Sequence, residues 1–149
     1  ALRRGFLVVI DYGYDAADLY SAAHRDGPLA TFLRHTSGDR ASVLQDPGDR
    51  DITAHVDLTA VTRAAEAAGL TALGRLDQTY FLLGLGLDGL LEGDAAPTAP
   101  FDAGALKRRL ALKTLMLPGG LGSTLKVLVF GRDVGTPALK GLSFGGRMT

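Results

Sequence analysis

The first candidate site is a group of polar and aromatic side chains that follows an apolar run near the start of the chain. In the stretch VVIDYGYD, Asp11, Tyr12 and Tyr14 come directly after that run. In open α/β sheets, ligands bind beyond the carboxyl ends of the strands. We therefore expect these side chains to face a pocket and Gly13 to let the backbone turn, which makes all four residues candidates for substrate binding. In the alternative, Asp11 only hydrogen-bonds loop amides and the tyrosines cover the end of the sheet.

A second candidate site lies in the stretch DITAHVD, residues 51–57. If this stretch is extended, residues two apart share a face, so that His55 and Asp57 point the same way together with Thr53. An acid beside an imidazole can orient it to take or give a proton near neutral pH. In the alternative, Asp57 caps the helix that follows and His55 packs in a satisfied hydrogen bond.

Composition and charge exclude several classes of partner. The 149 residues are enough for one domain with a sizeable core. Lysine plus arginine and aspartate plus glutamate number 16 each, so no overall charge draws the chain to nucleic acid or to an anionic membrane. No apolar run has the length of a membrane span, and the lack of cysteine fits a reducing compartment. We expect a cytoplasmic protein that binds neither nucleic acid nor a membrane.

Two other patterns in the sequence bear on metal binding and nucleotide binding. The spacing of His24 and His35 from His55 matches no pattern of metal ligands, so we expect no metal site. Residues 84–89 spell the dinucleotide fingerprint G-x-G-x-x-G, which places pyrophosphate at the start of a helix. The preceding segment is more helical than strand-like, and the following one is too interrupted for that helix. A nucleotide-binding protein would bind NAD saturably through these glycines, and we expect no such binding.

Apolar periodicity predicts the elements that position the candidate residues. The run 6–10 does not alternate with polar residues, which is typical of a strand buried on both faces. An apolar stripe after Asp57 predicts a helix that ends near Gly69. Further strands are predicted over residues 70–76 and 124–130, and further helices over 78–87 and from Asp102 to about residue 117. This order of strands and helices predicts an α/β fold.

The segment between the two candidate sites has a different composition. Residues 15–50 are rich in Asp, Arg, Ser and Gly and end in a turn-forming cluster, so we expect an irregular insertion there. Only PLATFLRH is expected to form a short strand or a helical turn. No linker divides the chain, which predicts a single domain over residues 1–149. Since the chain begins without Met shortly before its first strand, we expect a fragment of a longer protein.

Four stretches of the sequence, in this order, resemble the carboxyl-terminal half of the MidA family: GFLVVIDYGYDAADLY, DPGDRDITAHVDLTAVTRAAEAAGL, QTYFLLGLG and GSTLKVLVF. Members of this family are S-adenosylmethionine-dependent methyltransferases. They are related to the mitochondrial complex I assembly factor that methylates an arginine of a complex I subunit. The resemblance covers nearly all of the chain, and IDYGY followed by TAHVD is a fairly specific part of it.

This resemblance implies a Rossmann-like class I methyltransferase fold, of which the chain would hold the carboxyl-terminal half of the sheet. Residues 6–10 would form the fifth strand, 71–76 the sixth and 124–130 the antiparallel seventh. The glycine-rich cofactor loop of the family and its Asn-Glu-x-x-Asp-Ala-x-Pro motif precede IDYG, and neither is in these 149 residues. We therefore expect weak binding of S-adenosylmethionine by the chain alone and assign no cofactor-binding residue. A truncated sheet would also expose an edge and an apolar face, which invites self-association.

The resemblance further implies a protein substrate that is methylated on arginine. Asp11 would then hold the guanidinium, and Tyr12 and Tyr14 would wall the pocket or stack on the acceptor. His55 with Asp57 would remove a proton or orient the acceptor. A function of a different class stays open, namely an assembly or binding module that keeps the fold without transferring methyl groups. An intact cofactor loop favours catalysis, and a degenerate one favours binding.

Overall fold

The computed structural model describes residues 2–25, 27–33, 36–38, 43–89, 103–117 and 121–145. The chain forms two compact units, the first made of residues 1–11 with 65–149 and the second of residues 12–64. Among the described residues, no helix is long and apolar enough to cross a membrane. The cytoplasmic location of the protein stays a prediction.

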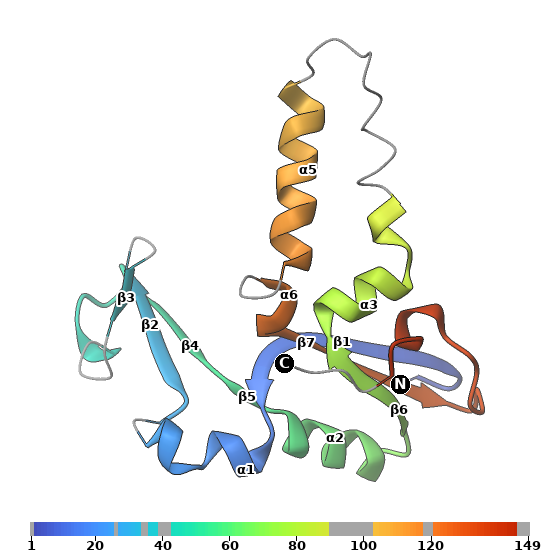
Figure 1. Ribbon diagram of the computed structural model, residues 1–149. Helices are drawn as coiled ribbons and strands as arrows, with labels where there is room; N and C mark the ends of the chain where they lie inside the picture. Colours follow the sequence, from blue (N-terminus) through green and yellow to red (C-terminus); the bar gives the residue numbers. More distant parts are fainter. Residues whose placement is uncertain are drawn as a thin grey trace. The chain divides into compact units, whose positions relative to one another are not determined.

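The first unit is built on a sheet in which the last strand of the chain occupies the middle. Strand β7 (Leu125–Arg132) lies between β1 (Gly5–Tyr14), which begins in this unit, and β6 (Thr71–Asp77) (Figure 1). Strands β6 and β7 run antiparallel, with Thr71 opposite Gly131 and Asp77 opposite Lys126. The prediction of an α/β fold with an antiparallel final strand is confirmed.

The core of the first unit gathers on both faces of β7. Leu76, Val127 and Val129 form a buried cluster, which is covered by the partly buried side chains of Leu73, Tyr80, Phe81, Leu139 and Leu142. Successive residues of a strand point to opposite faces, so Leu128 and Phe130 occupy the other face, and both are buried. The continuous apolar run of β7 is therefore matched by burial on both sides.

Strand β1 does not follow the same rule. Its predicted strand conformation is confirmed, but the prediction that it is buried on both faces is wrong for this chain. Phe6, Val8 and Ile10 are 44%, 45% and 49% exposed, and Leu7 is 41% exposed. An apolar run specifies a strand with two apolar faces, but it cannot supply the layers that cover them. Burial is thus a property of the neighbouring elements and not of the strand's own sequence.

Two glycines explain how the helices of the first unit pack. A Cβ on Gly84, the last residue of α3 (Gln78–Gly84), would overlap the backbone oxygen of Lys140. A Cβ on Gly141, in the short helix η3 (Lys140–Leu142), would overlap the ring of Phe81. The absence of both side chains therefore allows η3 to pack directly on α3. The glycine fingerprint at residues 84–89 thus begins at the end of a helix and not after a strand, as expected.

Two further helices complete the described part of this unit. Helix α5 (Ala103–Met116) follows the prediction, whereas α6 (Leu121–Thr124) occupies the segment just before β7. The predicted cap Asp102 lies outside the described residues. Gln78 and Thr79 hydrogen-bond the carbonyl oxygens of Leu115 and Met116, at 2.9 and 2.6 Å, which ties the end of α5 to the start of α3.

Helix α2 (Leu58–Ala67) ends where the sequence predicts. Gly69 has a φ of 80°, a conformation that favours glycine, and the amide of Leu70 donates to the carbonyl oxygen of Ala65 at 3.0 Å. The side chain of Arg132 then donates to the carbonyl of Ala68 at 3.0 Å. These bonds satisfy carbonyl groups that the helix leaves without a partner.

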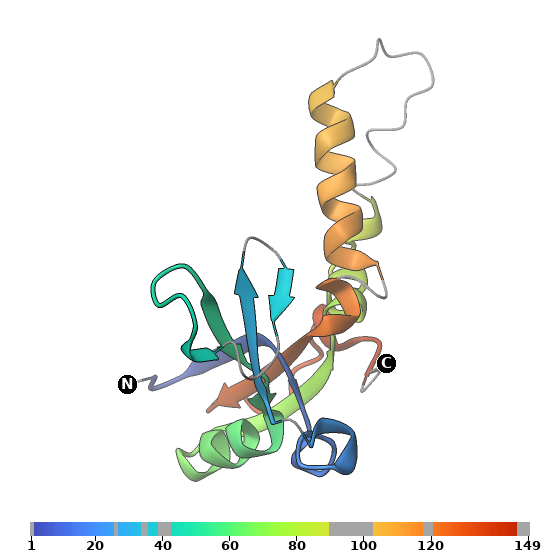
Figure 2. The ribbon, with the colours of Figure 1, turned by 90° about the vertical axis from the view of Figure 1, so that its left-hand side faces the viewer.

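The second unit holds more regular structure than its sequence indicates. Strands β2, β3 and β4 form an antiparallel sheet in the order β3-β2-β4 (Figure 2). The segment PLATFLRH contributes a strand, one of its two predicted conformations. The remaining strands are short and carry few apolar residues, which is why no periodicity revealed them. The elements of this unit are α1 (Ala16–Leu19), η1 (Ala22–His24), β2 (Leu29–Leu33), β3 (Thr36–Gly38), β4 (Asp51–Ala54), β5 (Val56–Asp57) and residues 58–64 of α2.

Candidate functional site

The candidate site is built on the end of β1, where the strand enters the second unit. Here β1 pairs in parallel with β5, and Gly13 and Tyr14 lie opposite Val56 and Asp57. A Cβ on Gly13 would overlap the backbone oxygen of Val56 and lie 2.9 Å from its carbonyl carbon. The prediction that Gly13 turns the backbone is therefore wrong, since the strand continues through Tyr14. The glycine is needed because β5 approaches it too closely for any side chain.

Tyr12 joins two parts of the second candidate motif. Its hydroxyl group shares a hydrogen bond with Oγ1 of Thr53 on β4. Its ring meets the ring of His55 edge to face, with 5.8 Å between centroids and planes at 77°. The expectation that Thr53 and His55 serve one site is thus supported, and the two are linked through Tyr12.

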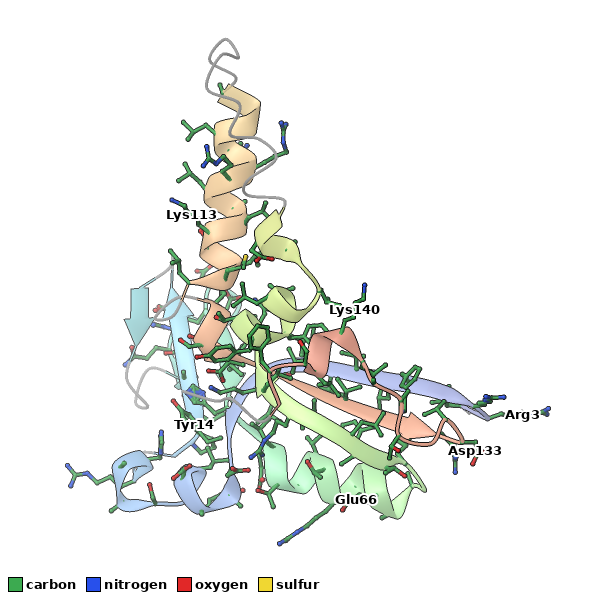
Figure 3. All side chains as sticks on the ribbon, turned by 45° about the vertical axis from the view of Figure 1, so that its right-hand side comes forward. Arg3, Tyr14, Glu66, Lys113, Asp133 and Lys140 are labelled. Carbon is green, nitrogen blue, oxygen red and sulfur yellow. The ribbon has the colours of Figure 1, made fainter. Side chains whose placement is uncertain are left out.

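Tyr14, which is labelled in Figure 3, contacts two imidazole rings. Its ring centroid lies 4.5 Å from that of His24 and 5.0 Å from that of His55, with both pairs of planes tilted by 46°. Tyr14 is itself 37% exposed, so a ligand can reach it. Tyr12, Tyr14, His24 and His55 together form what we call the aromatic–imidazole cluster.

His55 lies in the interior of this cluster. Its backbone amide donates to the carbonyl oxygen of Pro28 at 3.0 Å. Its ring atom Nδ1 is buried and has no hydrogen-bond partner in the described part of the chain. Burial disfavours the charged ring, and together with the nearby His24 it lowers the pKa of His55 below the usual value of 6.5. The ring is therefore neutral at physiological pH.

Asp57 serves the helix that follows it. One carboxylate oxygen accepts a hydrogen bond from the backbone amide of Ala60 at 2.8 Å, which is the geometry of a helix N-cap. Within the described residues, no hydrogen bond or ion pair joins this carboxylate to the ring of His55. The alternative in which Asp57 caps the helix is confirmed, and its role in proton transfer stays a prediction.

A second acid fixes the other side of the cluster. Oδ1 of Asp15 accepts from the hydroxyl of Thr59 at 3.2 Å, and the same hydroxyl accepts from the amide of Ala16 at 3.0 Å. The start of α1 is therefore bonded to the first turn of α2. These bonds hold the chain on either side of the tyrosines without using a tyrosine side chain.

Asp11 stands apart from the cluster. It is the last residue of the amino-terminal segment of the first unit and is half-buried. Because successive side chains of a strand point to opposite faces, Asp11 projects from the face of β1 opposite to Tyr12 and Tyr14. This alternation disfavours one pocket shared by the three side chains. The role of Asp11 in substrate binding stays a prediction.

His24 is the member of the cluster that sequence reasoning missed. The sequence analysis treats His24 only as a possible metal ligand. In the structure, its Nδ1 lies 2.8 Å from the carbonyl oxygen of Asp18. One local signal was present, because Ser21 accepts from the amide of Ala23 at 3.3 Å, as a cap for η1. That cap predicts a turn but not the contact with Tyr14. In the part of the chain that is described, no three acidic or histidine side chains are placed to hold a metal ion.

A known protein family matches the half of the chain that contains the aromatic–imidazole cluster. The sequence profile of a family described as "Putative S-adenosyl-L-methionine-dependent methyltransferase" matches residues 1–76. The chain belongs to this family. Every member of the aromatic–imidazole cluster lies within the matched residues, as does the whole of the second unit. The predicted class of enzyme and its cofactor are confirmed at the level of the methyltransferase family.

Two solved structures from Burkholderia thailandensis resemble this member of the methyltransferase family. One, described as a "likely methyl transferase" bound to S-adenosyl-homocysteine, is 30% identical with a TM-score of 0.76. The other, described as the native structure of an uncharacterized protein, is also 30% identical with a TM-score of 0.77, and both are described as members of the COG1565 superfamily. Both matches cover 95% of this chain but only 35% and 36% of the solved chains. This chain therefore spans about a third of their length. No curated protein matches the chain.

The expected weak binding of S-adenosylmethionine by this chain alone stays a prediction. The glycines at 84–89 are the nearest approach to a cofactor loop, yet the space beside Gly84 is filled by the backbone of Lys140. The phosphates of a dinucleotide would need open backbone amides at such a position. Among the described residues, the aromatic–imidazole cluster is our candidate for the site that binds the substrate.

Proposed function

We propose that the whole protein transfers a methyl group from S-adenosylmethionine to an arginine of a protein substrate. We further propose that this chain supplies the acceptor side of the reaction through its aromatic–imidazole cluster. Membership of the methyltransferase family, over the residues that include the cluster, is the observation that carries the proposal. The choice of arginine rests on the resemblance to the MidA family and on the chemistry of the cluster.

The cluster has the groups that a guanidinium acceptor requires. Aromatic rings stack on the flat face of a guanidinium, and Tyr14 is both aromatic and accessible. Tyr12 is oriented by its bond to Thr53 and can present its ring edge or its oxygen to the acceptor. Bringing the acceptor nitrogen onto the methyl carbon, with water excluded, is the main task of the protein in such a displacement. The carboxylate of Asp11 is our candidate for an ionic contact with the substrate chain.

Methyl transfer can be tested with isotope-labelled S-adenosylmethionine. The whole protein is incubated with an extract of cells from which its gene has been deleted. The labelled proteins are then digested, and their labelled residues are identified by mass spectrometry. We expect label on arginine of one or a few proteins. Label on another residue type would overturn the arginine acceptor, and no labelled protein above the background of a heat-inactivated sample would overturn the methyltransferase proposal.

Variants of the cluster sharpen this test. We expect Tyr14→Ala to lower kcat/KM by about tenfold or more, because the loss of one stacking contact costs about 1–2 kcal/mol. Tyr14→Phe keeps the ring and serves as the matched control, with a change of less than about threefold. The acceptor roles of Asp11 and His55 would be contradicted if Asp11→Asn and His55→Ala each left methylation unchanged.

A binding or assembly module is the second candidate, and calorimetry separates it from the enzyme. The whole protein is titrated with S-adenosylmethionine. Binding with transfer supports the enzyme, whereas a protein that binds a partner but neither binds the cofactor nor transfers label is a binding module.

We also propose that this chain self-associates through the exposed apolar side chains of β1, such as Val8 and Ile10. Sedimentation of Val8→Lys, compared with the unaltered chain, tests that proposal.

A further inference from the structure

Two imidazoles touch Tyr14, and the hydrogen bonds of their ring nitrogens differ. Nδ1 of His24 lies 2.8 Å from the carbonyl oxygen of Asp18, in the short helix α1. A carbonyl oxygen only accepts hydrogen bonds, so Nδ1 of His24 must carry a proton and donate it. A neutral ring has one N–H, and its second nitrogen, Nε2, therefore keeps a free lone pair.

The environment of this lone pair leaves it available to a ligand. Nε2 of His24 has no hydrogen-bond partner among the described residues, and it is not among the polar atoms that are buried without one. Among the described residues, Tyr14 is the titratable group in contact with the ring, His55 lies on the other side of Tyr14, and Asp18 contributes its backbone carbonyl. The ring that carries this lone pair is in contact with the ring of Tyr14, which is 37% exposed.

His55 shows the opposite arrangement. Its Nδ1 is buried without a partner, whereas its Nε2 is not. A proton on Nδ1 would be a buried N–H group with nothing to accept it, which costs more than placing the proton on Nε2, where water can accept it. The free lone pair of His55 is therefore on the buried atom, where an acceptor bound at the accessible side cannot reach it.

From these two arrangements we infer that His24, and not His55, accepts the proton that the methylated nitrogen releases. His55 then acts as a positioning residue that holds the rings of Tyr12 and Tyr14. This inference rests on the proposed methyl transfer. In that reaction the acceptor nitrogen forms a bond to the methyl carbon, while the carbon–sulfur bond breaks and its electron pair stays on sulfur. The proton of the nitrogen moves to Nε2 of His24, which leaves a singly charged imidazolium.

The tautomers can be measured on this chain without any methyl transfer. Long-range nitrogen–proton NMR spectra of the chain labelled with ¹⁵N in histidine distinguish the protonated from the free ring nitrogen. The signals of the three histidines are assigned with His24→Asn, His55→Gln and His35→Gln. We expect a proton on Nδ1 of His24 and on Nε2 of His55 at pH 8. A proton on Nδ1 of His55, or on Nε2 of His24, would overturn the inference.

Kinetics of the whole protein complete the test. His24→Asn keeps an amide that can donate to the carbonyl of Asp18 but removes Nε2, and its fold is checked by the NMR spectrum. We expect kcat to fall by about 10²–10⁴-fold with little change in KM, and the decline of rate at acid pH to disappear. His55→Gln, which keeps a donor in place of Nε2, should retain that acid decline and mainly raise KM.

The outcomes separate the two proposals. If His24→Asn keeps the kcat and the pH profile of the unaltered protein, His24 is not the proton acceptor, and the proposed methyl transfer stands. If the unaltered protein transfers no methyl group, the proposed function fails, and the role of His24 in proton transfer fails with it, whatever the tautomers are.

Discussion

The two units treat their buried polar groups in opposite ways. In the first unit, Nζ of Lys126 lies 2.6 Å from Oδ1 of Asp77 and donates to the carbonyl of Ser123 at 2.8 Å, with the lysine and aspartate side chains 8% and 1% exposed. In the second unit, Nδ1 of His55 and Nε of Arg50 are buried with no hydrogen-bond partner among the described residues. The first unit pairs its buried charges, and the second leaves polar atoms unpaired.

This contrast separates residues that stabilise the fold from residues that can bind a ligand. A buried polar group without a partner costs about 1–3 kcal/mol, so its presence calls for an explanation. In the second unit, an explanation is available in the aromatic–imidazole cluster, where the same ring carries a lowered pKa. We therefore expect substitutions in the first unit to act on stability, and those in the cluster to act mainly on the reaction.

The largest effect is expected from the buried ion pair. Lys126→Met leaves the carboxylate of Asp77 buried without its partner, which should lower the free energy of unfolding by about 3–5 kcal/mol. Urea unfolding followed by circular dichroism measures the loss. In the double variant Asp77→Asn with Lys126→Met, no charge is left buried, and most of the stability should return. A single variant as stable as the unaltered chain would show that the pair does not support the first unit.

Gly13 tests whether the candidate site also has a rigid part. Gly13→Ala places a methyl group against the backbone of Val56, which cannot move aside as a side chain could, and should cost about 1–3 kcal/mol. The matched control is Gly89→Ala, because a Cβ at Gly89 meets nothing within 4 Å. Equal unfolding midpoints for the two variants would contradict the close approach of β1 and β5.

Substitutions of Asp57 distinguish its role as a helix cap from a role in the reaction. Asp57→Ala removes the acceptor for the amide of Ala60 and should cost about 1 kcal/mol. Asn is an equally good N-cap, so Asp57→Asn should stay within a few tenths of a kcal/mol of the unaltered chain. If Asp57 only caps α2, Asp57→Asn also keeps the rate of methyl transfer. A stable Asp57→Asn variant without activity would restore its role in proton transfer.

The smallest effect concerns pH. The pKa of His55 is lower in the folded chain than in the unfolded chain, so below the unfolded value of 6.5 the unfolded chain binds more protons. The contribution of His55 to stability is therefore fully present above pH 6.5 and is lost as the pH falls through the folded pKa. Unfolding measured at pH 7.5 and at pH 5 should show this loss, and His55→Gln should reduce the difference between the two values. An unchanged pH difference in that variant would assign the loss to other groups.

The fold of the first unit could largely be predicted because its strands carry their own signal. The apolar run of β7 is a local pattern that agrees with the tertiary structure. The stripe of α2, which begins in the second unit and ends in the first, is another, with its cap at Asp57 and its end at Gly69. The exposure of β1 could not be predicted, since burial depends on which other layers are present. The short strands β2, β3 and β4 carry no such periodicity and are specified by their pairing.

The candidate site was predictable in part. Tyr12 and Tyr14 are predicted from their position after an apolar strand, and His55 from its two-residue spacing within an extended stretch. Both signals depend only on sequence order and the pleat of a strand. The contact of His24 with Tyr14 depends on the direction in which η1 turns, and one sequence carries no reliable signal for that. The cap formed by Asp57 was predicted as an alternative, but which alternative holds is decided by the position of α2.

The pairing of β1 with β5 has a consequence for how such a site can change over generations. The backbone there is held by Gly13, by the cap at Asp57 and by the bond between Asp15 and Thr59, none of which uses the ring of a tyrosine or a histidine. The rings can therefore be replaced one at a time while the frame that presents them stays intact. If the cluster binds the methyl acceptor as we propose, single substitutions at the rings can change the acceptor preference, whereas a substitution at Gly13 disrupts the frame on which any such preference depends.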